Sequence, residues 1–500
     1  MKFSKTGQAL LTAAVSIGIA LGITSCGQSN TIDYLYVTAS KNNPGQISVY
    51  RVDQESGAIT QIQDSPYPSG GRNPVAEVTS PNGADLYVVN HDDNTVVEFA
   101  IGTDAKLYPQ HTYQTPGTEP NAIAINSTGT LLFVLDTYQA TYSDANPGPG
   151  ALVVFPINSD GSLGTNVANG SLPYWPVEFA PSTINVTTPQ GCSGTAGSGT
   201  TLDFVYVANA NTNNPIAAAQ QGTISGFSFP IVPGTCVPSG GGVLTPVYSA
   251  TTPLPYAGVK PSASASDPTG RFLYVTDAAS NQLYAYTIAA TGTLTPLTNG
   301  PFKTDVYPDA ITINPNGMFI YVANYNSNDI SAYQIDQGTG TPSALAGSGT
   351  YGTKTGPTCV LVDPAFGTFL YTSNFLDSSV TGYKLNINNG ALTGTENSPY
   401  PTAGQPTCAA AVPHGNHPGE HVQATSGNGS KSFLRQRKGP HKMRAFVFGK
   451  TMHLQAMAAS SFNSWTRSAI CRAFRGLRLW KAMPAPRFRC NTAMLPAMRN

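Results

Sequence analysis

Residues 314–324 read NPNGMFIYVAN, and this short block, which recurs along the chain, decides the fold. A Pro-x-Gly turn leads into a strand that ends in Tyr-Val-Ala-Asn. Proline presets φ at the first turn position, and glycine tolerates the strained position that follows. Aromatic and β-branched side chains favour a pleated, half-buried surface. The block therefore predicts a tight turn followed by a buried β-strand.

The strand recurs seven times. Its aromatic residues are Tyr36, Tyr87, Phe133, Tyr206, Tyr274, Tyr321 and Tyr371. A partner strand follows each one with a second aromatic residue: Tyr50, Phe99, Phe155, Phe227, Tyr286, Tyr333 and Tyr383. Further short strands each open with a proline: Pro74, Pro120, Pro181, Pro261, Pro308, Pro357 and Pro406. Where no insertion intervenes, the units recur about every 46 to 50 residues, which is the size of a propeller blade. The sequence predicts an all-β fold, a seven-bladed β-propeller with four-stranded antiparallel blades.

The two ends of the repeat array complement each other. The first unit begins at Tyr34 and lacks a proline-led inner strand, whereas the strand at Pro406 arrives after the seventh unit. We expect this C-terminal strand to complete the first blade, because pairing the ends removes a free sheet edge. An open β-solenoid is the alternative, but solenoid coils run about 20–30 residues.

The N-terminus has the features of an export signal. Lys2 and Lys5 precede an apolar stretch that ends in Ile-Thr-Ser-Cys at Cys26, which resembles a lipobox. We expect residues 1–25 to be a lipoprotein signal peptide, with a short linker over 26–33. A lipidated Cys26 would tether the protein to a membrane in the cell envelope, on the periplasmic side or at the cell surface. An ordinary signal peptide cleaved nearby is the alternative.

The formal net charge of zero conceals two different segments. Residues 1–413 hold 11 Lys and Arg against 25 Asp and Glu, while residues 414–500 hold 15 against one. We expect the propeller to span 34–413 and not to bind nucleic acid, because its charge would repel phosphates. The basic tail, 414–500, is predicted to be disordered or unrelated to the propeller. A cationic amphipathic helix over 465–483 is the alternative.

Export permits disulfides. Cys192 and Cys236 both lie in long insertions around the fourth repeat, and Cys359 and Cys408 occupy equivalent places in consecutive repeats. Either pair is a candidate disulfide. Either pair can instead remain free, because a buried thiol packs as a small hydrophobe.

In propellers, ligands bind where inner-strand starts and the loops after the next strand meet around the channel. The candidate binding residues at this face are Arg72, Asn90, Asp92, Asp136, Lys260, Asp277, Asp309, Asn324, Tyr325 and Asn374. His91 is the candidate catalytic residue, as a general base or a metal ligand beside Asp92 and Asp93. Alternatively, these residues only hold the turn through side-chain-to-backbone hydrogen bonds. No metal or cofactor motif is present in the sequence, so we expect neither group.

The Tyr-Val-x-Asn strands and Pro-x-Gly turns resemble the YVTN-repeat, lactonase-like propeller family over roughly residues 34–413. Enzymes of that family include 6-phosphogluconolactonases and a muconate-lactonising enzyme. The resemblance implies Pro-Arg-His on one inner strand and Asn-Glu after one Tyr-Val strand. This sequence departs from that pattern: Val75 and Ala76 follow Pro74, and His91 follows Asn90.

Two functions are therefore predicted. The first is a monomeric, non-catalytic module that binds a small molecule, glycan or protein at the channel face. The second is a lactone hydrolase of the 6-phosphogluconolactonase-like class with His91 as its base.

Overall fold

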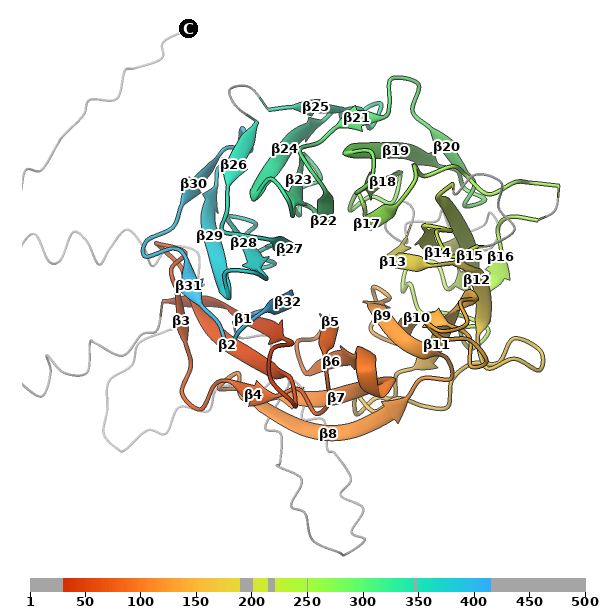
Figure 1. The fold of residues 1–500 in the computed structure, drawn as a ribbon, viewed down its shortest axis with the longest axis horizontal. Helices are drawn as coiled ribbons and strands as arrows, with labels where there is room; N and C mark the ends of the chain where they lie inside the picture. Colours follow the sequence, from red (N-terminus) through yellow and green to blue (C-terminus); the bar gives the residue numbers. More distant parts are fainter. Residues whose placement is uncertain (1–29, 189–200, 215–220, 250, 346–348, 415–500) are drawn as a thin grey trace, which may run out of the picture. The chain divides into compact units, whose positions relative to one another are not determined.

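A computed structural model describes residues 30–188, 201–214, 221–249, 251–345 and 349–414. These residues form seven antiparallel sheets arranged as blades around a central axis (Figure 1). The innermost strand of each blade contacts the innermost strands of both neighbouring blades. The predicted seven-bladed propeller is confirmed.

Blade 1 combines the two ends of the ring. From the channel outward it contains β32 (Pro406–Pro413), β1 (Thr31–Ala39), β2 (Gln46–Asp53) and β3 (Ile59–Gln61), and β4 (Tyr67–Pro68) also pairs with β2. The strand β32 pairs with β1 from Asp33↔Pro413 to Ala39↔Pro406. The predicted closure by the strand at Pro406 is therefore confirmed.

The next three blades contain four strands each. Blade 2 contains β5 (Pro74–Thr79), β6 (Asp85–Asn90), β7 (Thr95–Ile101) and β8 (Leu107–Gln114). Blade 3 contains β9 (Thr118–Ile125), β10 (Leu131–Tyr138), β11 (Pro149–Pro156) and β12 (Trp175–Phe179). Blade 4 contains β13 (Pro181–Thr187), β14 (Thr201–Asn209), β15 (Thr223–Ile231) and β16 (Thr245–Pro246).

Each of the last three blades adds a short fifth strand, which the sequence did not indicate. Blade 5 contains β17 (Pro261–Ser266), β18 (Phe272–Asp277), β19 (Gln282–Ile288), β20 (Leu294–Pro296) and β21 (Phe302–Lys303). Blade 6 contains β22 (Pro308–Ile313), β23 (Phe319–Asn324), β24 (Asp329–Ile335), β25 (Pro342–Ala344) and β26 (Thr350–Gly352). Blade 7 contains β27 (Pro357–Val362), β28 (Phe369–Asn374), β29 (Ser379–Leu385), β30 (Leu392–Gly394) and β31 (Tyr400–Pro401).

The repeated tyrosines connect neighbouring blades. The hydroxyl of Tyr274 in blade 5 donates a 2.7 Å hydrogen bond to the carbonyl of Gly340 in blade 6. The same contact joins other consecutive blades, with donor–acceptor pairs Tyr36–Ala105, Tyr87–Gly161, Tyr206–Gly292, Tyr321–Gly390 and Tyr371–Gly57. A buried hydroxyl needs a hydrogen-bond partner. Tyrosine can therefore take the place of phenylalanine in the core only where a carbonyl oxygen is in position to accept its hydrogen bond.

The glycines that accept these bonds are also required sterically. Gly340 has φ of +75°, and a Cβ there would lie 2.3 Å from the ring of Phe272 in the preceding blade. The Thr-Gly turn at residues 339–340 therefore lets one blade approach the aromatic core of its neighbour.

Several predicted features lie outside the described residues. They are the signal peptide, Cys26, most of the 26–33 linker, Cys192 and residues 415–500. No helix within the described ranges has the length and apolar character needed to cross a membrane.

Candidate functional site

The strand register brings both sets of predicted channel-face positions to the same end of the blades. In blade 2, Pro74 of β5 pairs with Asn90 of β6. The same proline-to-Asn or proline-to-Asp pairing recurs as Pro120↔Asp136, Pro181↔Asn209, Pro261↔Asp277, Pro308↔Asn324 and Pro357↔Asn374. We call this end of the channel the mouth. The residues that surround it come from the segment before each proline and the segment after each Asn or Asp.

Five of the predicted binding residues lie at or near strand ends and hydrogen-bond to neighbouring protein groups. The side chains of Asn90, Asp136, Asp277, Asn324 and Asn374 are fully buried. Their hydrogen bonds stay inside the protein: Asp277, for example, accepts from the backbone N–H groups of Val259 and Lys260, both at 2.9 Å. These hydrogen bonds agree with the alternative interpretation, in which an Asx side chain at a strand end holds the adjoining loop, and ligand binding by these five residues stays a prediction.

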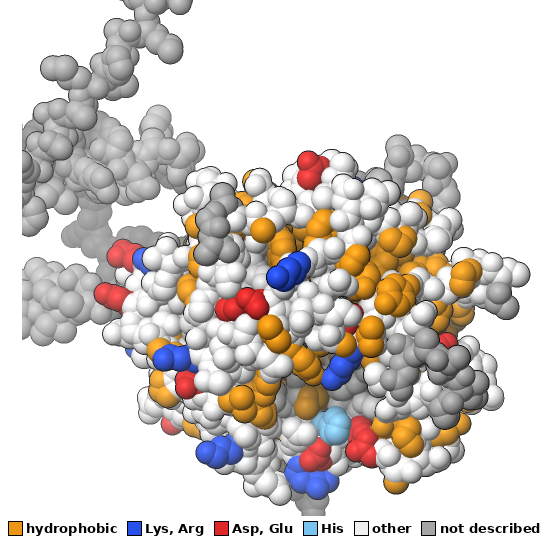
Figure 2. Space-filling model, turned by 45° about the horizontal axis from the view of Figure 1, so that its top comes forward, with side chains coloured by type: hydrophobic (Ala, Val, Ile, Leu, Met, Phe, Trp, Pro, Cys, Tyr) orange, Lys and Arg blue, Asp and Glu red, His pale blue; other side chains and the backbone are white. Residues whose placement is uncertain are grey.

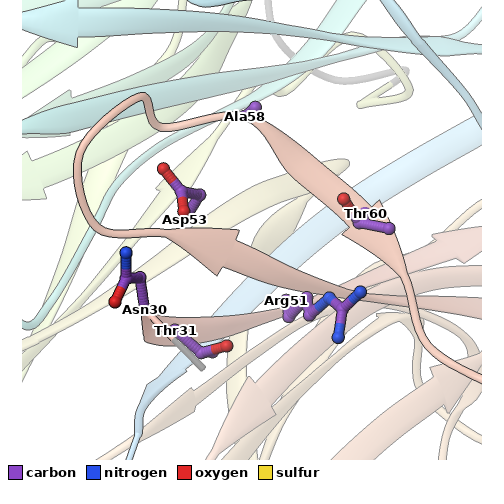
Figure 3. Close-up of a pocket in the computed structure, with 6 residues that line it drawn as sticks. All are labelled: Asn30, Thr31, Arg51, Asp53, Ala58 and Thr60. Atoms are coloured by element: carbon purple, nitrogen blue, oxygen red, sulfur yellow. The ribbon is translucent and has the colours of Figure 1, made fainter. Parts of the chain in front are cut away.

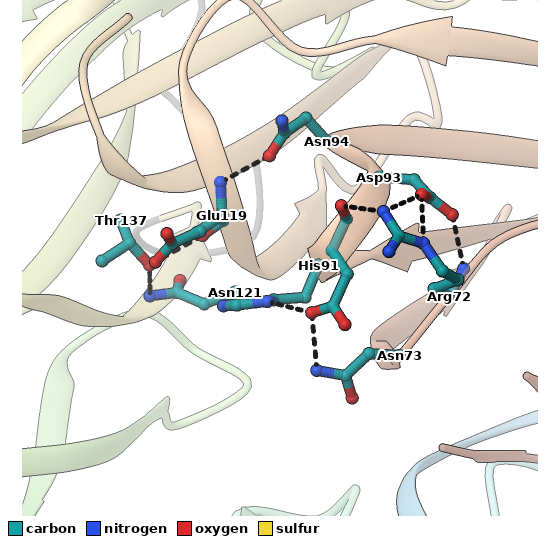
Figure 4. Close-up of polar contacts among 9 residues, drawn as sticks. Arg72, Asn73, His91, Asp93, Asn94, Glu119, Asn121 and Thr137 are labelled. Atoms are coloured by element: carbon teal, nitrogen blue, oxygen red, sulfur yellow. Dashed lines mark hydrogen bonds and ion pairs between the residues drawn. The ribbon is translucent and has the colours of Figure 1, made fainter. Parts of the chain in front are cut away.

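The remaining predicted residues divide into two groups, one on blade 2 and one on blades 5 and 6. His91 begins η1 (His91–Asp93), a single 3₁₀ turn that follows β6. The His91 Nδ1 lies 2.8 Å from Asp92 Oδ1, which also accepts a 3.1 Å hydrogen bond from the Asn73 amide (Figure 4). These two hydrogen bonds lower the pKa of Asp92, so an ionised carboxylate orients the imidazole.

The Arg72 guanidinium is bound by the carboxylate of Asp93. Its Nε and Nη2 lie 2.7 Å from Asp93 Oδ1, and Nη2 donates to the backbone carbonyl of Asp92 at 2.8 Å (Figure 4). The Arg72 backbone N–H donates to the other carboxylate oxygen of Asp93 at 2.6 Å. The guanidinium therefore fastens the loop before β5 to η1, although its side chain remains half exposed.

Glu119, which sequence reasoning missed, lies close to this group. It precedes Pro120 with φ of +55°, and its N–H donates a 2.7 Å hydrogen bond to the Asn94 side chain of blade 2 (Figure 4). Burial and the nearby charge of Asp144 raise the pKa of Glu119, while His91 acts in the opposite direction. Lys260 occupies the same place before Pro261, and that equivalence is the signal that could have identified Glu119.

Thr137 and Asn121 hydrogen-bond to each other, and Thr137 also hydrogen-bonds to the backbone of Glu119. The Thr137 hydroxyl donates to the Glu119 carbonyl at 2.7 Å, and the Asn121 amide donates to Thr137 Oγ1 at 3.0 Å (Figure 4). The same amide donates to the carbonyl of Pro181 in blade 4 at 2.7 Å. Blades 2 to 4 therefore share one continuous set of polar contacts at the mouth.

Blades 5 and 6 contribute a different surface. Lys260 Nζ donates a 2.8 Å hydrogen bond to the hydroxyl of Tyr307, whose ring centroid lies 6.0 Å from that of Tyr325. Asp309 lies within the electrostatic range of both Lys260 and Tyr325. Figure 2 shows one face of the molecule, where hydrophobic side chains form patches and a group of acidic, basic and histidine side chains gathers near the lower edge.

The predicted Cys359–Cys408 disulfide is absent from this structure. The two cysteines lie on β27 and β32 and are free thiols, with Sγ atoms 3.5 Å apart. The expectation of neighbouring strands is correct, since both are innermost strands of adjacent blades, but the thiols contact without a bond. The Cys192–Cys236 pairing stays a prediction, because Cys192 lies outside the described residues.

A polar hollow of about 220 Å³ lies at the other end of blade 1, where Thr31 pairs with Asp53 (Figure 3). Its Asp53 carboxylate accepts hydrogen bonds from the Ser56 hydroxyl and backbone, so it shapes the turn after β2. Among the described residues, no three His, Cys, Asp or Glu side chains are placed to share a metal ion. The mouth is therefore the candidate site.

Comparison with known proteins agrees with this architecture. The sequence profile of a family described as "Lactonase, 7-bladed beta-propeller" matches residues 34–171 and 242–362, together more than half of the chain. No curated protein sequence matches the chain.

Solved structures share the fold at low sequence identity. A periplasmic gluconolactonase from Pseudomonas aeruginosa is 17% identical, with a TM-score of 0.54 over 76% of this chain and 99% of that one. A candidate 6-phosphogluconolactonase from Bacteroides uniformis is also 17% identical, with a TM-score of 0.54 over 76% of this chain and 100% of that one. A protein from Lactobacillus plantarum is 18% identical, with a TM-score of 0.53 over 76% and 99%. At this identity the likeness shows the fold alone.

Proposed function

This chain belongs to the lactonase family of seven-bladed β-propellers, and on that premise we propose that it is an exported, lipid-anchored propeller whose mouth binds a small, hydroxyl-rich ligand without hydrolysing it. The observation that carries the proposal is that the Arg72 guanidinium is already engaged by protein groups. This guanidinium, the cation nearest to His91 in sequence, is bound by Asp93 and by the Asp92 carbonyl.

Lactone hydrolysis needs a base and a group that stabilises the developing oxyanion. His91 supplies a base, but the side chains that surround it are acidic: Asp92, Asp93 and Glu119. Carboxylates disfavour an oxyanion and repel phosphorylated substrates. They accept hydrogen bonds from hydroxyl groups well, which favours binding of a neutral polyol.

Hydrolysis of an unphosphorylated lactone is the second candidate, and one specific observation favours it. Asp92 is fixed by Asn73 and orients His91 through Nδ1, which leaves Nε2 as the nitrogen that can accept a proton from water. This arrangement resembles the base and orienting carboxylate of hydrolytic sites in general.

Export and lipidation support an envelope location for either function. The tether is Cys26, and the partners are a membrane at the N-terminus and a small molecule or glycan at the mouth. The proposal excludes nucleic acid as a partner, because the propeller segment is acidic.

The experiment is a lactone assay on the full-length protein in detergent, with glucono-1,5-lactone and γ-butyrolactone, corrected for spontaneous hydrolysis. We expect no rate above that of the heat-denatured protein. Turnover that is lost in His91→Ala but kept in His111→Ala would establish the second candidate instead. His111 is a matched control because it lies on the outer strand β8, where its ring contacts Glu98.

A further inference from the structure

We infer that blades 5 and 6 carry a subsite for a neutral pyranose unit, in which Tyr307 and Tyr325 stack against the sugar and Asp309 and Lys260 hydrogen-bond its hydroxyl groups. The inference rests on the proposed binding function and names the ligand class. It is carried by four side chains that are distinct from the His91 group of blades 2 and 3.

The two tyrosines form an angled aromatic platform. Their ring centroids lie 6.0 Å apart and the ring planes are inclined by 57°. Both residues are only partly buried, so part of each ring remains open to solvent. A pair of tilted rings offers two apolar faces, and the C–H face of a pyranose ring is the apolar surface that matches such a platform in size and shape.

Tyr307 is held in a conformation that large residues avoid. Its φ is +62°, in the left-handed region where a bulky side chain is a genuine outlier. Its N–H donates to the Asn281 side chain at 2.8 Å, and its carbonyl accepts the N–H of Tyr325 at 2.8 Å. The same positive φ recurs before the inner-strand prolines of other blades, at Asn73, Glu119, Ala180 and Gln405, so this conformation belongs to the repeat. In blade 6 it places a tyrosine at the mouth.

Tyr325 depends on a glycine in the next blade. A Cβ on Gly356 would lie 3.1 Å from Tyr325 Cε2 and 3.0 Å from Leu376 Cγ, closer than a side chain normally approaches. Leu376 is 57% exposed and continues the apolar surface beside Tyr325. The backbone of blade 7 thus supports the ring from below without covering its outer face.

Asp309 is a carboxylate that lacks a hydrogen-bond donor. Four of the equivalent residues, one position after the inner-strand proline, donate to the proline carbonyl of the next blade: Asn121, Ser262, Thr358 and Thr407. A carboxylate cannot make this contact when it is ionised. No described residue donates a hydrogen bond to Asp309, and burial raises the pKa of this carboxyl to about 6 against the opposing effect of Lys260. A ligand hydroxyl would supply the missing donor.

The charges define the ligand as neutral. Lys260 donates to the Tyr307 hydroxyl at 2.8 Å, and its ammonium lies 5.2 Å from the centre of that ring. Lys260 and Asp309 carry opposite charges, so together they provide no net charge that would favour a charged ligand. A neutral sugar can donate one hydroxyl to Asp309 and accept from Lys260 with a neighbouring hydroxyl, so it satisfies both groups at once.

The test is saturation-transfer NMR on the full-length protein, in a detergent without a sugar headgroup. The probes are maltotriose, cellotriose and chitotriose at about 10 mM, with glucuronate and glucosamine as charged counterparts. We expect saturation transfer to at least one neutral trisaccharide and to neither charged sugar. Tyr325→Ala and Asp309→Asn should each weaken binding about tenfold or more. Tyr108→Ala on the outer strand β8 should leave the affinity unchanged.

Other outcomes separate this inference from the proposed function. Absence of transfer to every neutral probe, or equal affinity in Tyr325→Ala, overturns the subsite. A sugar whose binding is lost only in His91→Ala moves the ligand to blades 2 and 3, which keeps the binding function and rejects this subsite. Lactone turnover that depends on His91 rejects the proposed function but leaves the sugar measurement to decide the subsite.

Discussion

Thr407 Oγ1 donates a 2.7 Å hydrogen bond to the carbonyl oxygen of Pro74, although the two residues are 333 positions apart in the chain. Thr407 lies on the ring-closing strand β32, and Pro74 begins the inner strand of blade 2. Ser262 makes the same contact with Pro308 within the continuous part of the ring. The closing strand is therefore joined to blade 2 through the same geometry as blades that follow each other in sequence.

This relationship predicts the effect of shortening the chain. Deleting residues 406–500 removes β32, which pairs with β1. The strand β1 then becomes an open sheet edge. We expect aggregation, or a fall in Tm of more than about 10 °C, because a large set of hydrogen bonds and buried contacts is lost at once. Differential scanning calorimetry and light scattering provide the measurement.

Deleting residues 415–500 is the matched control. It retains His414, whose N–H donates to the Ile32 carbonyl at 2.7 Å, and it leaves β32 intact. The Tm of this shorter protein should equal that of the full chain within about 2 °C. A large loss of stability would show that the basic tail is part of the folded protein.

The tyrosine contacts between blades make a second prediction. Tyr274→Phe removes the hydrogen bond to Gly340 and leaves a buried carbonyl without its donor. We expect the free energy of unfolding to fall by about 1–2 kcal/mol. Chemical denaturation of both proteins measures this difference in unfolding free energy, and we expect the m-value to be unchanged. Tyr108→Phe serves as the control on the outer strand, and an equal loss there would contradict the proposed role of the buried hydroxyl.

The number of blades, the inner strands and the ring closure could be predicted because each is written in the local pattern of the repeat. Pro406 and Tyr34 carry recognisable halves of one blade. The short fifth strands such as β21 (Phe302–Lys303) could not be predicted, because two residues are too few to show the alternation of apolar and polar side chains that indicates a strand. They form because the short fourth strand pairs with only one end of the third strand of the same blade, as β20 does on β19, and the fifth strand pairs with the other end.

The candidate site was less accessible to sequence reasoning. Asn324 and Tyr325 are adjacent, and the sequence assigned both to the mouth. In the structure Asn324 is fully buried and bonded to Asp329, whereas Tyr325 is partly exposed. Asn324 is the last residue of β23 and Tyr325 begins the turn that follows, so the alternation of the strand does not predict where the Tyr325 side chain lies. Glu119 was missed because its position before Pro120 matters only once the ring brings it beside His91.

The lipid anchor is open to a direct test. Cys26→Ser removes the thiol that an acyl group would modify. We expect the protein to move from the membrane fraction to the soluble fraction on cell fractionation, and metabolic labelling with a fatty-acid analogue to disappear. Retention of the label in the variant would place the modification elsewhere, and a soluble wild-type protein would reject the anchor.

Asp136 makes the last prediction, which concerns pH. Its carboxyl group is fully buried; Oδ2 accepts the Gly117 N–H at 2.8 Å, and Oδ1 has no partner among the described residues. Burial raises its pKa to about 8, and the hydrogen bond from Gly117 opposes that rise only in part. The folded state therefore binds a proton that the unfolded state releases near pH 4, so the stability from this group is complete at low pH and is lost as pH rises to about 8.

Asp136→Asn should cancel that loss, because asparagine occupies the equivalent place in other blades at Asn90, Asn209, Asn324 and Asn374. The gain in unfolding free energy of the variant over the wild type should be small near pH 4. It should grow to a few kcal/mol by pH 8 and then level off. Asp277→Asn is the control: both oxygens of Asp277 accept backbone N–H groups, so an amide there loses one acceptor and should destabilise the protein. Urea denaturation across this pH range measures the unfolding free energy of each variant and of the wild type. If the difference between Asp136→Asn and the wild type does not change with pH, Asp136 is ionised in the folded protein.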